Sequence, residues 1–174
     1  MSTEVQSYPL RPFMPADTPA LRDLFAQSIE ELTAEDYDED QRLAWISTAE
    51  DADAFAKRLG SMLTLVVQLD GIYLGFTSLK DNKTIDMLYV HPDYAGEGIG
   101  TALVDALEKI AAARGTETLT TDASDAAVTF FERLGYVQTS RNSVPVAEQW
   151  LSNTTMTKRL TPSKDKPASP VKPS

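Results

Sequence analysis

The first third of the chain combines a short strand candidate at residues 8–13 with segments whose apolar residues follow a helical spacing. One helix is predicted with Thr18 as N-cap and Pro19 at its first position, because proline is favoured where the backbone N–H is not needed. Its inward stripe is Leu21, Leu24, Phe25, Ser28, Ile29 and Leu32. A short helix around Trp45 follows, and a capping-box pattern at Ser47–Glu50 predicts the start of another helix.

The middle of the chain changes to strand-like patterning. Residues 63–69 and 72–79 are apolar runs joined by Asp70-Gly71, a strong signal for a tight hairpin. A third strand is predicted at 84–90, so the three strands form an antiparallel meander. A long amphipathic helix at 99–114 then begins with apolar residues spaced every three or four positions.

The last part of the chain predicts a strand at 117–122, which follows a helix and therefore pairs parallel with the preceding strand. Ser124 is expected to cap a second helix, and residues 136–146 and 148–160 form a closing pair of strands. The final segment, 161–174, has four prolines, three lysines and no apolar periodicity, which predicts a disordered tail.

Composition fits one α/β domain over residues 1–160 of the 174-residue chain. The net charge of −10 argues against a nucleic-acid partner, and the acidic body favours a cationic ligand. The chain has no cysteine and one histidine, which argues against a thiolate or histidine-cluster metal site. No apolar run is long enough for a membrane span and no signal peptide is evident, so a cytoplasmic location is expected.

Candidate chemistry concentrates after the strand that ends at Val90. Pro92 stops the strand, and Gly96, Gly98 and Gly100 then lead into the long helix. Glycines let a ligand approach the backbone, and the free N–H groups of a helix N-terminus bind anions, so this stretch suits a pyrophosphate. The spacing matches neither the dinucleotide-binding glycine pattern nor a phosphate-binding loop that ends in Gly-Lys-Ser/Thr.

The same stretch resembles the acetyl-CoA loop of the GNAT (Gcn5-related) N-acetyltransferases, which reads R/Q-x-x-G-x-G/A after a strand that ends in Val-x-Pro. Here the strand ends in Val90-His91-Pro92 and the loop is residues 95–100. A second similarity is Phe-Phe-Glu-Arg-Leu-Gly-Tyr at 130–136, and the resemblance covers roughly residues 8–160. It implies a mixed central sheet in the order β-α-α-β-β-β-α-β-α-β-β, with two central strands that splay apart.

The resemblance also implies an N-acetyltransferase that moves acetyl from acetyl-CoA to an amine by direct attack in a ternary complex, without a metal. The acceptor would be a small-molecule or peptide amine. Backbone groups of Leu88 and Val90 would flank the thioester arm. The expected pyrophosphate-binding residues are Ala95, Gly96, Glu97, Gly98, Ile99, Gly100 and Thr101. Ser124 corresponds to an asparagine that contacts the CoA arm in many members, and it has its capping role as an alternative.

Two positions depart from the family pattern. Ala95 replaces the usual Arg or Gln of the loop, which removes one polar contact and leaves the backbone cradle. Phe131 replaces a frequent tyrosine that protonates the departing thiolate, so another residue, water or no acid at all serves that step. We expect Phe131 to pack against the CoA arm.

Several residues are candidates for proton transfer. Asp86 is the first choice as general base, because some family members carry a carboxylate on this strand; its alternative role is a solvated strand carboxylate. Strand alternation would put it on the face opposite Ile85 and Met87. His91 is a second candidate, since imidazole titrates near neutral pH. Tyr136 is a candidate proton donor, although a core position after the helix is its alternative role. The remaining candidates are Asp122 as a base and Tyr37 as a proton donor.

The region that shapes the acceptor site in this family is here the mostly acidic segment 30–40, which either attracts an amine or is a solvated charge run. Ala95 and Phe131 also leave open a non-catalytic acyl-CoA-binding or sensor module as an alternative function. Members of the family often form homodimers, so a homodimer is one expected assembly.

Overall fold

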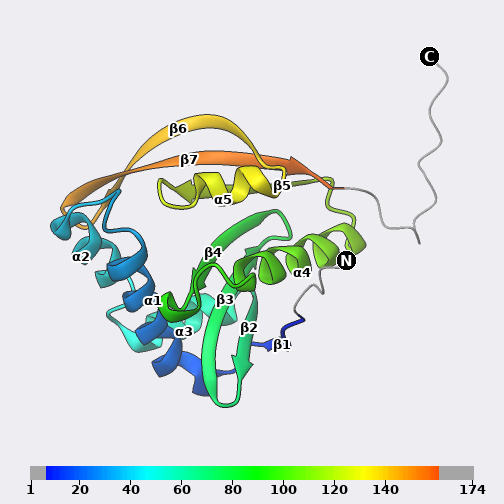
Figure 1. Cartoon of the computed structure of the whole chain (residues 1–174), viewed down its shortest axis with the longest axis horizontal. Helices are drawn as coiled ribbons and strands as arrows, with labels where there is room; N and C mark the ends of the chain where they lie inside the picture. The colour runs from blue at the N-terminus through cyan, green and yellow to red at the C-terminus, as the bar shows by residue number, and fades with distance from the viewer. Residues whose placement is uncertain (1–6, 161–174) are drawn as a thin grey trace.

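Seven strands form one mixed sheet in the computed structural model, which describes residues 7–160 (Figure 1). The strands are β1 (Leu10–Pro12), β2 (Leu63–Leu69), β3 (Ile72–Lys80), β4 (Thr84–Val90), β5 (Thr118–Ser124), β6 (Val137–Val146) and β7 (Gln149–Arg159). Their spatial order is β1-β2-β3-β4-β5-β7-β6. Within the described residues, β4 and β5 pair in parallel and every other neighbouring pair is antiparallel. The predicted meander and the parallel return are therefore confirmed.

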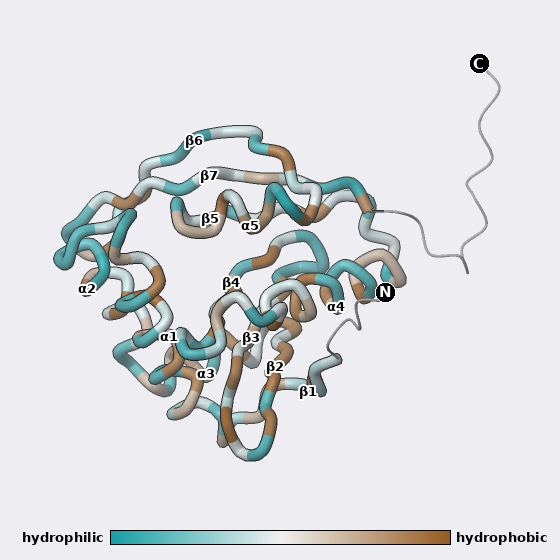
Figure 2. Tube along the Cα trace, viewed as in Figure 1, coloured by the Kyte–Doolittle hydropathy of each residue, from teal (hydrophilic) through white to brown (hydrophobic). Residues whose placement is uncertain are grey.

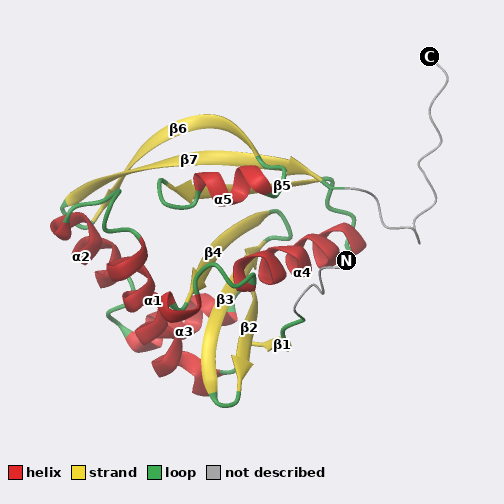
Figure 3. Cartoon of the chain, in the orientation of Figure 1, coloured by secondary structure: helices red, strands yellow, loops and turns green. Residues whose placement is uncertain are grey.

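Helices cover both faces of this sheet (Figure 3). They are α1 (Thr18–Leu32), α2 (Glu39–Ser47), α3 (Ala52–Gly60), α4 (Ile99–Ala113) and α5 (Val128–Arg133), with 3-10 turns at Pro15–Asp17 and Pro92–Tyr94. Leu103 and Leu107 of α4 belong to one buried cluster, whereas Leu21 and Phe25 of α1 belong to another on the opposite face. Figure 2 shows hydrophobic residues along β2 and β3, and both α1 and α4 contact β3. The molecule therefore has two cores, one on each side of the sheet.

Two predicted helix starts are wrong, and for one of them a competing cap is present nearby. Ser47 lies at the end of α2, and the next helix begins instead after Asp51, whose side chain accepts from the Ala54 N–H at 3.0 Å. Thr18 lies within α1, whose N-cap is Asp17. Three α-helices separate β1 from β2, because the predicted short helix around Trp45, which the element order β-α-α-β left out, is formed as α2.

The β5–α5 connection also differs from the prediction. Ser124 is the last residue of β5 and does not cap a helix; α5 begins four residues later with Ala127 at its N-cap position. The predicted tail at 161–174 lies outside the described residues. No helix within residues 7–160 is long and apolar enough to cross a membrane.

A buried carboxylate ties the start of the chain to the sheet. The two carboxylate oxygens of Asp17 accept from the Arg11 guanidinium at 2.7 and 2.8 Å, from the Tyr73 hydroxyl at 2.7 Å and from the Met14 N–H at 2.8 Å. The Asp17 residue is 1% exposed. The hydrogen bond from Arg11 is the main reason that the pKa of Asp17 falls to about 2. This network fixes β1, α1 and β3 relative to one another, away from the site described next.

Candidate functional site

A cleft opens where β4 and β5 separate. The two strands pair only at Thr84 with Thr120 and at Ile85 with Thr121. Beyond this point β4 pairs with β3 alone, and β5 continues along β7. The resulting cleft has a volume of about 820 Å³ and passes through the sheet between the α4–α5 side and the side of α1, α2 and α3. The predicted splay of the central strands is thereby confirmed.

Backbone groups of β4 face this opening. The His91 N–H donates to the Leu74 C=O of β3 at 2.8 Å. Because the hydrogen-bonding groups of a strand alternate between its two edges, Leu88 and Val90 direct theirs away from β3 and into the cleft. Both residues also line the cleft, so the two predicted backbone positions lie where donors and acceptors are free for an extended ligand.

A β-bulge in β4 sets the direction of Asp86. Leu79 pairs with Ile85 and Ser78 pairs with Met87, so that Asp86 is the extra residue of β4. Ile85 consequently packs in the cluster that contains α4, and Met87 packs in the cluster that contains α1. The prediction that Asp86 faces away from both neighbours is wrong, because the bulge puts those neighbours on opposite faces.

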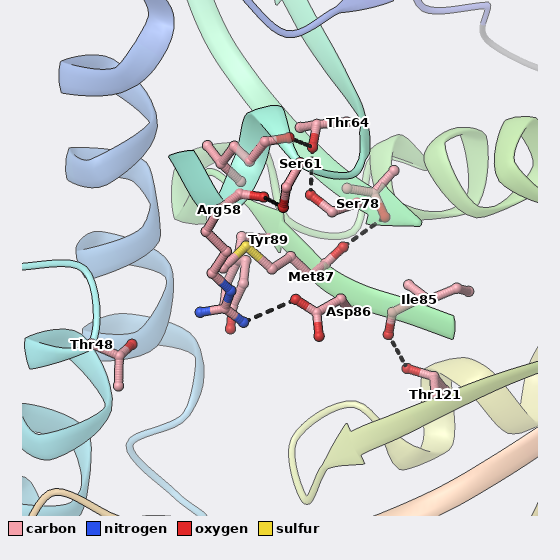
Figure 4. Close-up of polar contacts among 12 residues, drawn as sticks. Thr48, Arg58, Ser61, Thr64, Ser78, Ile85, Asp86, Met87, Tyr89 and Thr121 are labelled. Atoms are coloured by element: carbon pink, nitrogen blue, oxygen red, sulfur yellow. Dashed lines mark hydrogen bonds and ion pairs between the residues drawn. The ribbon is translucent and has the colours of Figure 1, made fainter. Parts of the chain in front are cut away.

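Asp86 lines the cleft and forms an ion pair with Arg58 of α3. The Arg58 Nη2 donates to the Asp86 Oδ2 at 2.9 Å (Figure 4). The Arg58 side chain is 43% exposed and the Asp86 side chain is 26% exposed, so both charged groups are accessible from the cleft. Sequence analysis missed Arg58, because it is 28 residues from Asp86 and no local pattern joins the two.

The glycine loop forms the opposite end of the cleft. Gly96 and Gly98 have φ values of 81° and 86°, which favour glycine, and Gly98 is the N-cap residue of α4. The Ala102 N–H is the first to bond within the helix, to the Gly98 C=O at 3.0 Å, which leaves the preceding N–H groups of the first turn free. A Cβ built at Gly96 or Gly98 meets no atom within 4 Å, and both glycines line the cleft, so open space lies beside the loop. The loop therefore fits an anionic group such as a pyrophosphate.

Helix α5 closes the loop from one side. A Cβ at Gly100 would lie 3.2 Å from the Phe130 ring, so the third glycine of the loop is needed for close packing and not for its backbone angle. Phe131 is 3% exposed, lines the cleft and packs against Phe130 and Tyr136 at ring-centroid distances of 5.1 and 5.2 Å. The position at which many family members have a phenol is therefore apolar here.

The structure brings most of the predicted site residues to one cleft. Those that line it are Asp86, Leu88, Val90, Ala95, Gly96, Gly98, Ile99, Gly100, Thr101, Asp122, Ser124 and Phe131. Glu97 is not among the lining residues, and its C=O accepts from the Tyr8 hydroxyl at 2.6 Å. This bond fixes the loop between its two positive-φ glycines.

Two predicted catalytic residues lie outside the lining of the cleft. The His91 Nδ1 accepts from the Asp93 N–H at 3.1 Å, so this side chain caps the turn after β4. Tyr136 is 2% exposed and donates to a Glu108 carboxylate oxygen at 3.0 Å. Burial, followed by the charge of Glu108, raises the pKa of the Tyr136 phenol. Tyr136 thus has its alternative role in the core, which corrects its selection as a proton donor in the site.

Tyr37 joins the acidic segment to the other side of the cleft. Its hydroxyl donates to the Ser152 C=O at 2.6 Å and accepts from the Asp125 N–H at 2.9 Å. Burial raises the pKa of this phenol, and its hydrogen is already engaged. Tyr37 therefore holds the segment between α1 and α2 against β7 and the start of the β5–α5 connection.

Tyr89 is a further lining residue that sequence analysis missed. The Trp45 indole donates to the Tyr89 hydroxyl oxygen at 3.1 Å, and within residues 7–160 no acceptor binds the Tyr89 hydroxyl hydrogen. Burial raises the pKa of Tyr89, so the phenol stays protonated at neutral pH. Tyr89 follows Met87 by two residues, so strand alternation puts both on the same face of β4; this spacing was the sequence signal that could have identified Tyr89.

Comparisons with known proteins agree with this architecture. The family model of the acetyltransferase (GNAT) domain matches residues 33–160. The chain belongs to the GNAT acetyltransferase family. A GCN5-related N-acetyltransferase from Rhodopseudomonas palustris, designated "Aminotransferase, Class-II", has a crystal structure with a TM-score of 0.89 and 51% sequence identity over 92% of this chain and 100% of that chain. The predicted family, fold class and enzyme type are confirmed.

Two more distant relatives extend the comparison. The uncharacterized N-acetyltransferase YafP of Escherichia coli K12 is 29% identical over 144 residues, which cover 83% of this chain and 91% of YafP. The PaiA N-acetyltransferase of Thermoplasma acidophilum, solved in complex with coenzyme A, has a TM-score of 0.74 and 19% identity over 88% of this chain and 99% of that chain. The latter similarity supports the fold.

Proposed function

We propose that this GNAT enzyme transfers acetyl from acetyl-CoA to an amine by direct attack in a ternary complex. The observation that carries the proposal is the cleft itself. It joins the free N–H groups of the α4 N-terminus to the open edge of β4 and continues to Asp86 on the far side of the sheet. One end suits a pyrophosphate, and the other end offers polar side chains to an acceptor.

The donor would bind along backbone groups. Its pyrophosphate fits the loop of Gly96 and Gly98, and its extended arm would run beside β4, with Leu88 and Val90 supplying strand-like hydrogen bonds. Two proteins with the same fold support this arrangement, since PaiA was solved with coenzyme A and YncA from Salmonella typhimurium with acetyl-CoA. YncA has a TM-score of 0.61 and 22% identity.

In the proposed reaction, the nitrogen of a neutral amine attacks the thioester carbonyl carbon. A C–N bond forms, the C–S bond breaks, and the electron pair leaves with sulfur as thiolate. The N–H groups that β4 directs into the cleft are suited to stabilise the negative charge on the carbonyl oxygen. Asp86 receives the amine proton, directly or through water.

This proposal needs no side-chain acid and no covalent enzyme intermediate. Phe131 has no proton to donate, but a thiol has a pKa low enough for sulfur to leave as thiolate. The absence of cysteine from the sequence removes the usual nucleophile for an acyl-enzyme. The competing function, a non-catalytic acyl-CoA-binding module, predicts binding without turnover.

The test is amine-dependent release of free thiol from acetyl-CoA. Because the chain contains no cysteine, a thiol-reactive dye reports released CoA without a background from the protein. We expect release that requires both protein and an amine from a chemically diverse panel. Binding of acetyl-CoA with no release above the buffer rate for any amine would contradict catalysis and favour the binding module.

A further inference from the structure

Two of the charged side chains that line the cleft form an ion pair with each other. Among the described residues, the charged side chains that line the cleft are Arg58, Asp86, Asp122 and Arg133. Arg133 lies on α5, which packs against the glycine loop, and an oxygen of Asp122 accepts from the Thr155 hydroxyl at 2.6 Å. Arg58 on α3 and Asp86 on β4 are the cation and the anion of this lining that form an ion pair with each other.

The contact between these two residues leaves most of the guanidinium free. Arg58 donates to Asp86 through one nitrogen only, and no second partner for the guanidinium is found among residues 7–160. A guanidinium has five N–H donors in a planar fork that matches a carboxylate. Figure 4 shows the Arg58 side chain extending beside Tyr89, with the guanidinium next to Asp86. The pair thus presents unused donors beside an anionic oxygen.

We infer that the acceptor is an amine that also carries a carboxylate, as an amino acid does. The inference rests on the proposed function and specifies its substrate class. The acceptor's carboxylate binds the free N–H donors of Arg58, and its amino group lies against Asp86, which receives the proton when the amine is activated. The ion pair thus matches both charges of a zwitterion.

The overall charge explains why such a residue is needed. The last fourteen residues carry three Lys and one Asp, so the rest of the chain has a net charge of −12, which repels a carboxylate and attracts a simple polyamine. A polyamine needs no arginine in its site, and Arg58 would repel it. Arg58 supplies a local cation with free N–H donors in a region whose net charge disfavours an anionic group.

The uncharged lining limits the rest of the acceptor. Leu32, Trp45, Val144, Val146 and Leu151 also line the cleft. These walls suit an apolar side chain, because its transfer from water to an apolar surface is favourable. Leucine, methionine and phenylalanine are therefore the first acceptors to test.

The experiment compares each amino acid with its carboxamide, which keeps the amine and the side chain but lacks the negative charge. Because loss of that charge lowers the pKa of the amine, kcat/KM is expressed per neutral amine for both acceptors. Wild-type protein, Arg58→Gln and Arg58→Lys are assayed for CoA release, with Arg159→Gln as the matched control. Arg159 is exposed at the end of β7 and does not line the cleft. We expect wild-type kcat/KM to favour the acid at least about tenfold, in line with a charge-assisted bidentate contact.

Arg58→Gln should remove this preference mainly through KM for the acid, so that kcat/KM falls at least about tenfold more for the acid than for the carboxamide. Arg58→Lys should restore part of the preference, because the charge returns without the fork. Arg159→Gln should behave as wild type. Equal kcat/KM values for acid and carboxamide in the wild-type protein would overturn the inference. An equal loss of kcat/KM for both acceptors in Arg58→Gln would also overturn it, because it would show that Arg58 only supports Asp86.

A binding measurement separates this inference from the proposed function. The thermal unfolding of the CoA-saturated protein is recorded with N-acetylleucine and with its carboxamide, neither of which needs to react. Stabilisation by the acid alone, lost in Arg58→Gln, would support the acceptor site even if no amine released CoA. Equal effects of acid and carboxamide, or none, would overturn the acceptor inference and leave acetyl transfer to other amines in place.

Discussion

The two ends of the cleft are built in different ways. The donor end consists mainly of backbone groups in one continuous segment, from the end of β4 through Gly98 to the first turn of α4. The acceptor end consists of side chains from several separate elements, among them Trp45 on α2, Arg58 on α3, Asp86 and Tyr89 on β4, and Leu151 on β7. One end is therefore encoded locally and the other only by the tertiary fold.

This difference predicts how each end responds to change. Most side-chain substitutions leave the backbone N–H groups of a helix N-terminus in place. We therefore expect the donor end to bind its ligand with Ala95 in place of the usual Arg or Gln. Side chains that meet across 28 residues, as Arg58 and Asp86 do, depend on the exact placement of α3 against a bulged strand. Substitutions at the two ends should consequently separate acetyl-CoA binding from acceptor turnover.

The largest expected effect is at the donor end. Gly98→Trp should weaken acetyl-CoA binding by at least about 100-fold, because an indole would fill the space in which the pyrophosphate is held by N–H groups. Calorimetric titration measures this loss. Gly71→Trp is the matched control: Gly71 has a φ of 80° and equally open space, but it lies in the β2–β3 turn. We expect both variants to be destabilised to a similar extent and only Gly98→Trp to lose acetyl-CoA binding. Unchanged acetyl-CoA binding by Gly98→Trp would contradict the role of the loop in binding the pyrophosphate.

The next effect is at the acceptor end. Asp86→Asn keeps the size of the side chain and an oxygen for Arg58 but removes the proton acceptor, so kcat should fall by roughly 100-fold. Titration should give an acetyl-CoA Kd within about twofold of wild type, since Asp86 is outside the loop. Asp105→Asn, exposed on α4, is the control. A kcat within about threefold of wild type would remove Asp86 as the base.

A third substitution, Asp17→Asn, should change the stability of the protein without affecting either end of the cleft. Asp17 has a pKa of about 2 in the folded protein, below the value of about 3.9 for an unfolded aspartate, so its network contributes about 2 kcal/mol above pH 4. This stabilisation is lost as the pH falls from about 4 to 2, because the unfolded chain binds the proton first. At pH 7, Asp17→Asn should lower Tm by about 4–8 °C.

Unfolding curves at pH 7 and pH 2.5 measure this effect, with exposed Asp23→Asn as the control. The difference in Tm between Asp17→Asn and the wild-type protein should become smaller at the lower pH. A difference that stays constant between the two pH values would show that packing, and not the carboxylate charge, accounts for the loss. The acetyl-CoA Kd of the folded variant should match that of wild type.

The smallest expected effect concerns the missing phenol. Phe131→Tyr adds a hydroxyl where many family members have one, yet kcat should change less than about threefold, because in the proposed reaction the thiolate leaves without a proton. Steady-state assays near neutral pH measure this change. A rise of tenfold or more would show that a general acid is needed and that the wild-type site lacks it.

The sequence was informative where structure is local. The glycine loop and the Asp70-Gly71 hairpin were predicted because each depends on neighbouring residues. The parallel return of β5 was predicted because a helix connects it to β4. Asp51 replaced the predicted capping box because several polar residues in that segment can cap, and tertiary packing selects among them.

The acceptor end was harder to predict for physical reasons. A bulge shifts strand alternation at one position, and the residues of β4 carry no signal that identifies Asp86 as the extra one. Tyr136 was expected either in the site or in the core, and only the buried hydrogen bond to Glu108 decides for the core. Arg58 reaches Asp86 only because α3 packs on α1 and β2, which requires the whole fold.

The most direct test of the central claim is thermal unfolding of the wild-type protein with acetyl-CoA, and with ATP and NAD as separate controls. A ligand at a hundredfold its Kd adds about 2.7 kcal/mol to stability, which for a chain of this length raises Tm by several degrees. The glycine loop and the open edge of β4 predict this rise with acetyl-CoA and little change with ATP or NAD. No rise with acetyl-CoA, or an equal rise with all three, would contradict an acetyl-CoA site in this cleft.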